Sequence, residues 1–161
     1  MFKKSIMKRK GFTLIELLVV ISIIAILSAV TFASLRPSKR LDDSRDATRW
    51  TDISVLANAV KMDQVDNGGT YLTAIINATS SLNFKIGTAT SGCSDCTATT
   101  TQAACIDLTG LVTEGYMGSL PLDPSNGTAG ETNYYFIKNS NDTVVVGACN
   151  PDGTAAIAIT K

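Results

Sequence analysis

The sequence predicts an α+β protein in which a long N-terminal helix packs on a small antiparallel sheet of about three strands. Three observations lead to this fold class. A run of 24 residues, 12–35, carries one charged side chain, and a polar segment with helical spacing follows it. The end of the chain holds β-branched and aromatic runs separated by turn residues. A connector that contains two of the four cysteines joins the helix to the sheet.

The apolar run from Phe12 to Leu35 is long enough to cross a membrane. A helix of this length measures about 36 Å, and the hydrocarbon layer of a bilayer is about 30 Å thick. Five basic residues precede the run and no acidic residue does: Lys3, Lys4, Lys8, Arg9 and Lys10. Because basic segments stay in the cytoplasm, we expect a cytoplasmic amino end and an extracellular remainder.

The charged residue within the apolar run is Glu16. Insertion scales assign an acidic side chain about 2.5 to 3.5 kcal/mol at the membrane centre, so Glu16 requires a partner. A cut between Gly11 and Phe12 would create one, because the new amino group of Phe12 could lie beside Glu16 of a neighbouring subunit. Glu16 and Phe12 are therefore the predicted assembly residues.

The stretch Lys8-Arg-Lys-Gly-Phe-Thr-Leu-Ile-Glu-Leu-Leu18 resembles the class III signal of type IV pilins and pseudopilins. This resemblance implies that a prepilin peptidase and methyltransferase cleaves after Gly11 and methylates the amino group of Phe12. It also implies that Glu16 is needed for assembly into a filament of this chain and related minor pilins, built on an inner-membrane assembly platform. DNA or a host surface is a further possible partner, and no cofactor is implied.

Two other interpretations of the N-terminal run remain open. A cleaved secretory signal also has a basic start, but its apolar core usually has about 7 to 15 residues and ends in a small-residue site. Thr31-Phe32-Ala33 is a poor version of such a site. A plain membrane anchor fits the length, but it gives no reason for Gly-Phe-Thr-Leu-Ile-Glu at the basic boundary.

The helix is expected to continue through residues 36–66 as an amphipathic segment. Pro37 should kink or loosen it, because proline removes one backbone hydrogen bond. Asn67-Gly68-Gly69 should end it, because Asn and Gly tolerate the left-handed conformation. Residues with helical spacing mark the face toward the sheet: Trp50, Ile53, Leu56, Ala57, Val60 and Gln64. The segments 46–60 and 66–71 resemble the docking and closing parts of a pseudopilin helix.

Small residues form a second pattern, on the apolar half of the helix. They recur at intervals of three and four: Ser22, Ala25, Ala29 and Ala33. Such a stripe lets helices approach closely within a membrane. The alternative is that Ala and Ser are simply common in membrane helices.

The cysteines all follow the apolar run: Cys93, Cys96, Cys105 and Cys149. An even number in an extracellular domain predicts two disulfides, with three pairings open. The spacing of Cys93 and Cys96 also suits a zinc site, but no second Cys-x-x-Cys or His pair completes it. We therefore favour disulfides.

The connector, residues 71–104, is rich in Thr, Ser, Ala and Gly and is expected to be mostly loop, with disorder as the alternative. Short helices are predicted near residues 72–82 and 106–115, and a proline-set turn at 116–124. The expected strands are 133–138, 143–149 and 154–160. The predicted parts of the chain are thus a leader, a transmembrane and assembly helix, its amphipathic continuation and an extracellular pilin domain: 1–11, 12–35, 36–66 and 67–161.

Charge and composition exclude several functions. The chain has 14 basic and 14 acidic side chains and no histidine. Removal of the five leader bases would give a net charge of −5, which provides no footprint for nucleic acid. We find no nucleophile with a base and no phosphate loop, so no enzyme is predicted. Weak calcium candidates are Asp123 and Asp142, with Glu131 and Asn133 as further oxygen donors, although no loop of fixed ligand spacing is present.

The resemblance to the class III signal implies a structural subunit of a type IV pilus-like filament. It would begin as a single-pass protein of the cytoplasmic membrane and end in a filament at the cell surface. Adhesion, motility, DNA uptake and secretion are all roles such filaments can serve. The alternatives are a membrane-anchored extracellular binding module that does not polymerise, a pseudopilin of a type II secretion system, and a secreted enzyme.

Overall fold

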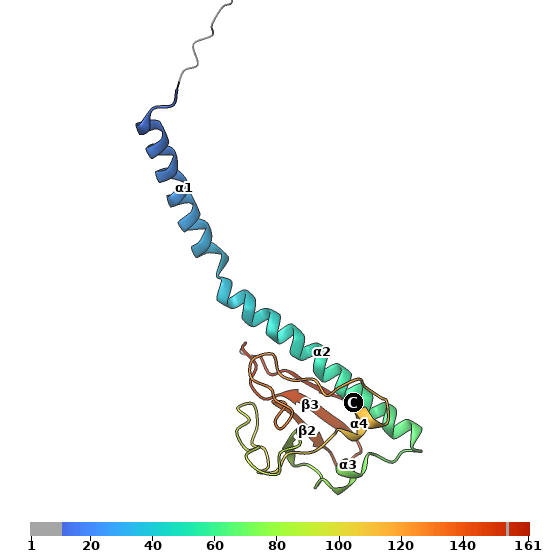
Figure 1. Cartoon of the computed structure of the whole chain (residues 1–161). Helices are drawn as coiled ribbons and strands as arrows, with labels where there is room; N and C mark the ends of the chain where they lie inside the picture. The colour runs from blue at the N-terminus through green and yellow to red at the C-terminus, as the bar shows by residue number, and fades with distance from the viewer. Residues whose placement is uncertain (1–10, 154) are drawn as a thin grey trace, which may run out of the picture. The chain divides into compact units, whose positions relative to one another are not determined.

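The computed structural model describes residues 11–153 and 155–161, so the five predicted cytoplasmic cations lie outside the described residues. The chain divides into two units, residues 1–40 and 41–161. The elements, in chain order (Figure 1), are α1 Leu14–Leu35, α2 Pro37–Asp66, α3 Thr73–Asn77, β1 Asn83–Lys85, α4 Gly110–Thr113, β2 Tyr134–Lys138, β3 Val144–Ala148 and β4 Ala158–Thr160. The predicted α+β class and the long N-terminal helix are confirmed.

The predicted interruption of the helix occurs at Arg36. This residue caps α1 in the left-handed conformation, with φ 40° and ψ 65°. Pro37 follows and has no N–H to donate to the preceding turn. The backbone N–H of Arg40 donates to the carbonyl of Arg36 at 3.4 Å, so regular helix bonding resumes at once.

Helix α2 ends where the sequence predicts. Its last residue is Asp66, and Gly68 and Gly69 follow with φ 64° and 95°. Positive φ is open to glycine without steric cost, and it turns the chain out of the helix.

The buried face of α2 differs from the prediction by one residue. Ile53, Leu56 and Val60 are buried as expected, but Trp50 is 44% exposed. Arg49 is fully buried in its place. The buried face therefore keeps the predicted positions between 53 and 60, differs from the prediction at Trp50, and leaves the predicted Gln64 half-buried.

The sheet has four strands where the sequence predicted about three. Its order is β1-β2-β3-β4, and every neighbouring pair is antiparallel. The additional strand, β1, lies in the connector that was expected to be loop. Its three residues pair with β2 through Asn83 to Ile137, Phe84 to Phe136 and Lys85 to Tyr135. The last strand is shorter than predicted and begins at Ala158.

The two faces of the sheet carry two different cores. Alternate residues of a strand point to opposite faces. Tyr134 and Phe136 join the main core with the buried residues of α2, which runs along this face of the sheet (Figure 1). Tyr135, between them, packs on Cys96 and Cys149 in a smaller core on the other face.

The connector is ordered mainly by long-range contacts. The short helix predicted within it is reduced to the 5 residues of α3, and the one predicted after it, at 106–115, is reduced to the 4 residues of α4. Ile86 forms an isolated bridge with Ile106, and the N–H of Gln102 donates to the carbonyl of Asn83 at 2.9 Å. These contacts contradict the alternative of a disordered linker.

Candidate processing and assembly site

The predicted cleavage boundary, Gly11-Phe12, lies at the start of the described chain. Phe12 is 86% exposed. A Cβ atom built on Gly11 would meet no atom within 4 Å, and the φ of Gly11 is not in the left-handed region. Neither the space nor the backbone of this chain therefore requires glycine here. A requirement for glycine would have to come from a partner that binds the boundary.

Glu16 forms a capping box with Thr13 at the start of α1. The Thr13 N–H donates to Glu16 Oε2 at 2.8 Å, and the Thr13 hydroxyl donates to the same oxygen at 2.7 Å. In return, the Glu16 N–H donates to Thr13 Oγ1 at 3.3 Å. Two free N–H groups of the first turn are thereby satisfied. Within one chain, then, Glu16 binds Thr13 and leaves the predicted pairing with Phe12 to a second subunit.

This local role of Glu16 was absent from the sequence analysis. The signal was present, because Thr13-x-x-Glu16 immediately before an apolar run is the sequence signature of a capping box. The capping box satisfies hydrogen bonds of the carboxylate but supplies no positive charge. The electrostatic cost of Glu16 in an apolar setting is therefore reduced and not removed.

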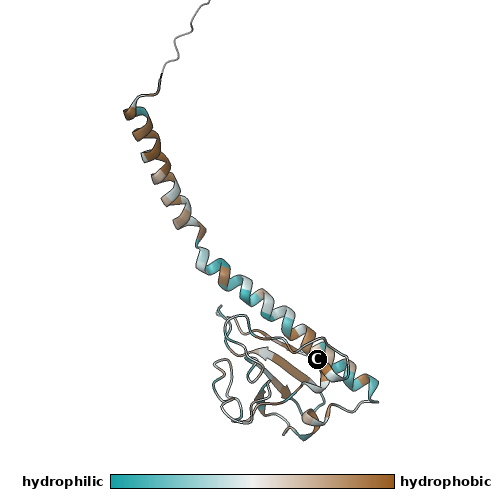
Figure 2. Cartoon of the chain, viewed as in Figure 1, coloured by the Kyte–Doolittle hydropathy of each residue, from teal (hydrophilic) through white to brown (hydrophobic). Residues whose placement is uncertain are grey.

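Helix α1 exposes its apolar surface on all sides. Its 22 residues include none that is buried, and Figure 2 shows hydrophobic residues along most of its length. By length and composition, the apolar part of the helical stretch Leu14–Asp66 is sufficient to cross a membrane. A helix that is apolar all round is stable in lipid or against other helices, not in water.

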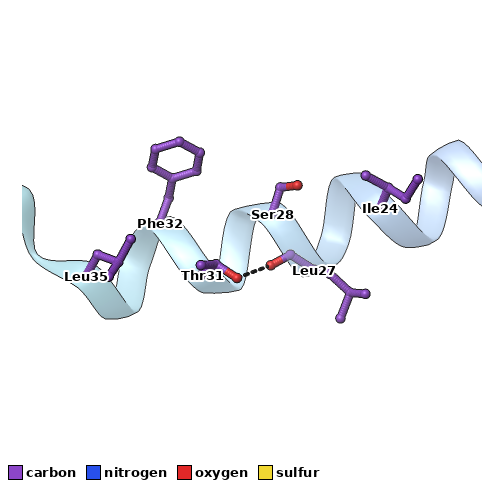
Figure 3. Close-up of a pocket in the computed structure, with 6 residues that line it drawn as sticks. All are labelled: Ile24, Leu27, Ser28, Thr31, Phe32 and Leu35. Atoms are coloured by element: carbon purple, nitrogen blue, oxygen red, sulfur yellow. Dashed lines mark hydrogen bonds between the residues drawn. The ribbon is translucent and has the colours of Figure 1, made fainter.

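The surface of α1 also has a hollow of about 310 Å³ near its end, lined by Ile24, Leu27, Ser28, Thr31, Phe32 and Leu35 (Figure 3). The Thr31 hydroxyl donates to the Leu27 carbonyl at 2.8 Å, as Figure 3 shows, and the Ser22 hydroxyl donates to the Leu18 carbonyl at 2.8 Å. Both hydroxyls are thus satisfied inside the helix, which suits an apolar medium.

A buried ion cluster centred on Arg49 of α2 lies in the second unit. Arg49 donates from Nε and Nη2 to Asp123 at 2.6 and 3.0 Å. Its Nη1 donates to Asp46 at 2.7 Å and to Asp152 at 2.6 Å. The side chains of Arg49 and Asp123 are both fully buried. The cluster joins α2 to the loop that contains Asp123 and to the loop after β3.

The hydrogen bonds within this cluster stabilise the charged forms of Arg49, Asp46 and Asp152. The hydrogen bond to Asp123 raises the pKa of Arg49 despite the opposing effect of burial. Burial raises the pKa of Asp46, but the hydrogen bonds from Arg49 and from the N–H groups of Asp152 and Gly153 outweigh it and lower the pKa overall. Hydrogen bonds from Arg45 and Arg49 lower the pKa of Asp152.

The four predicted cysteines form two disulfides, Cys93–Cys105 and Cys96–Cys149. No cysteine is free, so no thiolate remains for the alternative zinc site. The first bridge joins Cys93 of the connector to the residue that directly follows the connector. The second fastens the connector to the end of β3, where the N–H of Ala98 also donates to the carbonyl of Cys149 at 2.9 Å.

A second fastening of the connector is the buried side chain of Lys85 in β1. Its Nζ contacts Asp95 and donates to Glu131 Oε2 at 2.9 Å. Burial lowers the pKa of Lys85, but the hydrogen bonds to these two carboxylates outweigh it and raise the pKa overall. Asp95 lies between Cys93 and Cys96 in the sequence. The two disulfides and the ion pair of Lys85 with Asp95 therefore hold the same loop.

The weak calcium candidates lie in different surroundings. The Asp123 carboxylate is occupied by Arg49, as described above, and also accepts the N–H of Ser125 at 2.9 Å. Asp142 lies in the turn between β2 and β3, and its carbonyl accepts from Tyr71 at 2.7 Å. Glu131 binds Lys85, and the Asn133 amide donates to Asn126. Among the described residues, no group of three or more Asp, Glu, His or Cys side chains is placed to hold a metal.

Comparisons with known proteins match part of the chain. Residues 6–32 match the family described as the prokaryotic N-terminal methylation motif. The chain is also 40% identical over 60 residues to the type II secretion system core protein G of Escherichia coli (strain K12). This match covers 37% of the chain and spans 40% of the length of that protein. No solved structure matches the chain.

Proposed function

Since the methylation motif and the alignment support membership of the type IV pilin and pseudopilin family, we propose that this chain is a structural subunit of a type IV pilus-like filament. It is made as a membrane-anchored precursor with its amino end in the cytoplasm. A prepilin peptidase cleaves it after Gly11 and methylates Phe12. The mature subunits then polymerise through their N-terminal helices, and the domain of residues 67–161 lies outside the cell.

The observation that carries this proposal is the exposed apolar surface of α1, with Glu16 at its start. Transfer of α1 from lipid to a bundle of identical helices keeps its 22 residues in an apolar setting. The hydrophobic free energy of burial is therefore largely retained. If α1 instead left the lipid and exposed its apolar surface to water, that hydrophobic free energy would be lost.

Glu16 gives the assembly its register. In a bundle, the carboxylate is removed from water, and an unpaired buried charge costs several kcal/mol. The amino group of Phe12 from a neighbouring subunit would neutralise it after cleavage. A subunit out of register leaves the charge unpaired and is disfavoured.

Two substitutions separate the hydrogen bonds that Glu16 makes to Thr13 from the charge that it offers to Phe12 of a neighbour. Glu16→Gln keeps a side-chain oxygen that accepts the Thr13 N–H, but it removes the charge. Glu16→Leu removes both. We expect both variants to be processed to Phe12, and both to be lost from sheared surface filaments when they are the only copy of the subunit. Mass spectrometry of the amino terminus and immunoblots of sheared and membrane fractions measure the two outcomes.

The proposal fails if Glu16→Gln assembles at the wild-type level, because the hydrogen bonds of the capping box would then be sufficient. It also fails if the wild-type chain keeps residues 1–11 and lacks N-methyl-phenylalanine. In that case the chain is a membrane-anchored module that does not polymerise.

A second function, that of a secretion pseudopilin, is favoured by the alignment with a core protein of a type II secretion system. Deletion of the gene distinguishes the two functions. Loss of surface filaments with normal protein secretion indicates a pilin, and loss of secretion from a cell without surface filaments indicates a pseudopilin. In both cases the subunit is structural and not catalytic.

A further inference from the structure

Three basic residues follow the apolar helix directly. Arg36 caps α1, and Lys39 and Arg40 lie in the first turn of α2. All three are exposed. They belong to the same unit as α1, so their position at the end of that helix is part of one compact body.

The length of α1 places these residues at a membrane surface. Its 22 residues span about 33 Å, and the hydrocarbon layer is about 30 Å thick. When α1 crosses the layer, the next five residues, 36–40, add about 7.5 Å and lie at the level of the lipid phosphates. Lys and Arg side chains are long enough to adjust their depth toward the headgroups.

The three cations have no acidic partner in the described part of the chain. Arg45 and Arg49, further along α2, are both bound by aspartates. None of the ion pairs among the described residues includes Arg36, Lys39 or Arg40. Arg40 Nε donates to the Leu35 carbonyl at 3.2 Å, which holds its guanidinium at the end of α1.

Helix stability accounts for these cations only in part. Arg36 and the guanidinium of Arg40 lie at the C-terminal end of α1, where the helix dipole favours a positive charge, but Lys39 lies in the first turn of α2, where the dipole disfavours one. Acidic side chains begin two residues later, at Asp42 and Asp43, so the basic residues are those nearest the apolar helix. This order suits a negatively charged surface at the end of α1.

We propose that Arg36, Lys39 and Arg40 bind the phosphate groups of anionic phospholipids where α1 leaves the membrane. The inference rests on the membrane-anchored precursor of the proposed function. Each basic residue near an anionic membrane surface strengthens binding, and salt weakens it. The contact holds α1 at a fixed depth, and the subunit must release these lipids when it leaves the membrane for a filament.

A photo-crosslinking amino acid at position 38 tests this proposal locally, because Ser38 lies between Arg36 and Lys39. The full chain is inserted into vesicles of equal amounts of phosphatidylglycerol and phosphatidylcholine. Lipid adducts at position 38 are then identified by mass spectrometry. We expect phosphatidylglycerol adducts to exceed phosphatidylcholine adducts at least about fivefold, the factor that one basic residue provides at a membrane surface. A probe at Thr48, about 15 Å further along α2 than position 38, should give few lipid adducts.

Matched variants assign the preference to these cations. Lys39→Gln/Arg40→Gln should reduce the ratio of the two adducts severalfold, toward the composition of the vesicle. Lys138→Gln/Lys161→Gln removes the same charge from the second unit and should leave the ratio unchanged. The local probe also excludes lipids bound by the five cations that precede Gly11.

Three results would overturn the inference. Equal amounts of the two adducts in the wild-type chain would show that the cations do not select the anionic lipid. A preference that survives in Lys39→Gln/Arg40→Gln assigns it elsewhere. Adducts with a second copy of the chain in place of lipid assign the cations to a contact between subunits. If the chain does not insert into vesicles at all, the membrane anchor of the proposed function fails as well.

Discussion

Helix α1 and the second unit, residues 41–161, obtain their order from different sources. None of the 22 residues of α1 is buried, whereas the second unit buries a core that joins α2 to the sheet. In the described part of the chain, no buried side-chain nitrogen or oxygen lacks a hydrogen-bond partner. The second unit is therefore specified by its own contacts, and α1 depends on what surrounds it.

The polar residues show the same contrast. Glu16 binds Thr13, three residues away in sequence. Arg49 binds Asp123 and Asp152, which are 74 and 103 residues away. A change in the first unit should consequently alter processing or assembly without unfolding the domain. A change in the second should alter the stability of the domain itself.

The largest expected effect is on processing, from Gly11→Trp. A peptidase must approach the backbone at the cut bond, and the indole ring would obstruct it, so we expect only the precursor. The domain should keep its thermal midpoint, because the chain itself leaves open space at Gly11. Immunoblotting and a thermal melt measure the two results. Gly118→Ala, at another glycine with open space, is the control and should be processed normally. A normal amount of mature Gly11→Trp protein would refute this prediction.

Arg49→Ala should produce the next largest effect, on the stability of the second unit. Removal of one partner from a buried ion pair costs about 3 to 5 kcal/mol, because Asp123 stays buried without its counter-charge. Urea unfolding of the full chain in detergent measures the change. Arg40→Ala, at an exposed position, should change the free energy of unfolding by less than about 0.5 kcal/mol. Similar losses in both variants would contradict the assignment of stability to the cluster.

The two disulfides should differ in their contribution. Cys96–Cys149 joins residues 53 apart in sequence and Cys93–Cys105 joins residues 12 apart. Loop-closure entropy predicts losses of about 4 and about 3 kcal/mol when the pairs are replaced by alanine. Urea unfolding of Cys96→Ala/Cys149→Ala and Cys93→Ala/Cys105→Ala tests the order. The reverse order would show that local packing, and not chain entropy, decides the effect.

The smallest expected effect is a loss of stability in acid. The pKa values of Asp46 and Asp152 are lowered in the folded state. Their contribution is therefore complete above the unfolded pKa of about 3.9 and is lost as the pH falls through the folded values. Burial raises the pKa of Asp52, which acts in the opposite direction and favours the folded state as the pH falls. The urea midpoint should thus decrease more between pH 5 and pH 3 in Asp52→Asn than in the wild type. An equal or smaller fall would argue against these signs.

Local signals allowed the long elements to be predicted from the sequence. Pro37 and Asn67-Gly68-Gly69 act on the backbone next to them, so the interruption and the end of the helix could be placed closely. The strands β2 and β3 were found within one residue at each end, because β-branched and aromatic residues are concentrated there. The predicted processing boundary and Glu16 were likewise identified from one short stretch of sequence, residues 8–18.

Contacts between distant residues could not be predicted in the same way. Strand β1 has three residues and exists because β2 pairs with it. Arg49 was not among the residues predicted to face the sheet, because its partners Asp123 and Asp152 are remote in sequence and no local pattern indicates that it is buried. Trp50 was assigned to the buried face because tryptophan is apolar, but the neighbouring Arg49 occupies that face. Disulfide connectivity likewise depends on the folded chain.

The loop after β3 is held from both sides of the sheet. On one side, Arg45 and Arg49 of α2 bind Asp152 at 2.7 and 2.6 Å. On the other, Cys149 is bonded to Cys96 of the connector. A mechanical load that enters the domain through α2 therefore passes through ion pairs to the end of β3 and then through a covalent bond to the connector. The helix, the sheet and the connector are thus joined to one another at the end of β3.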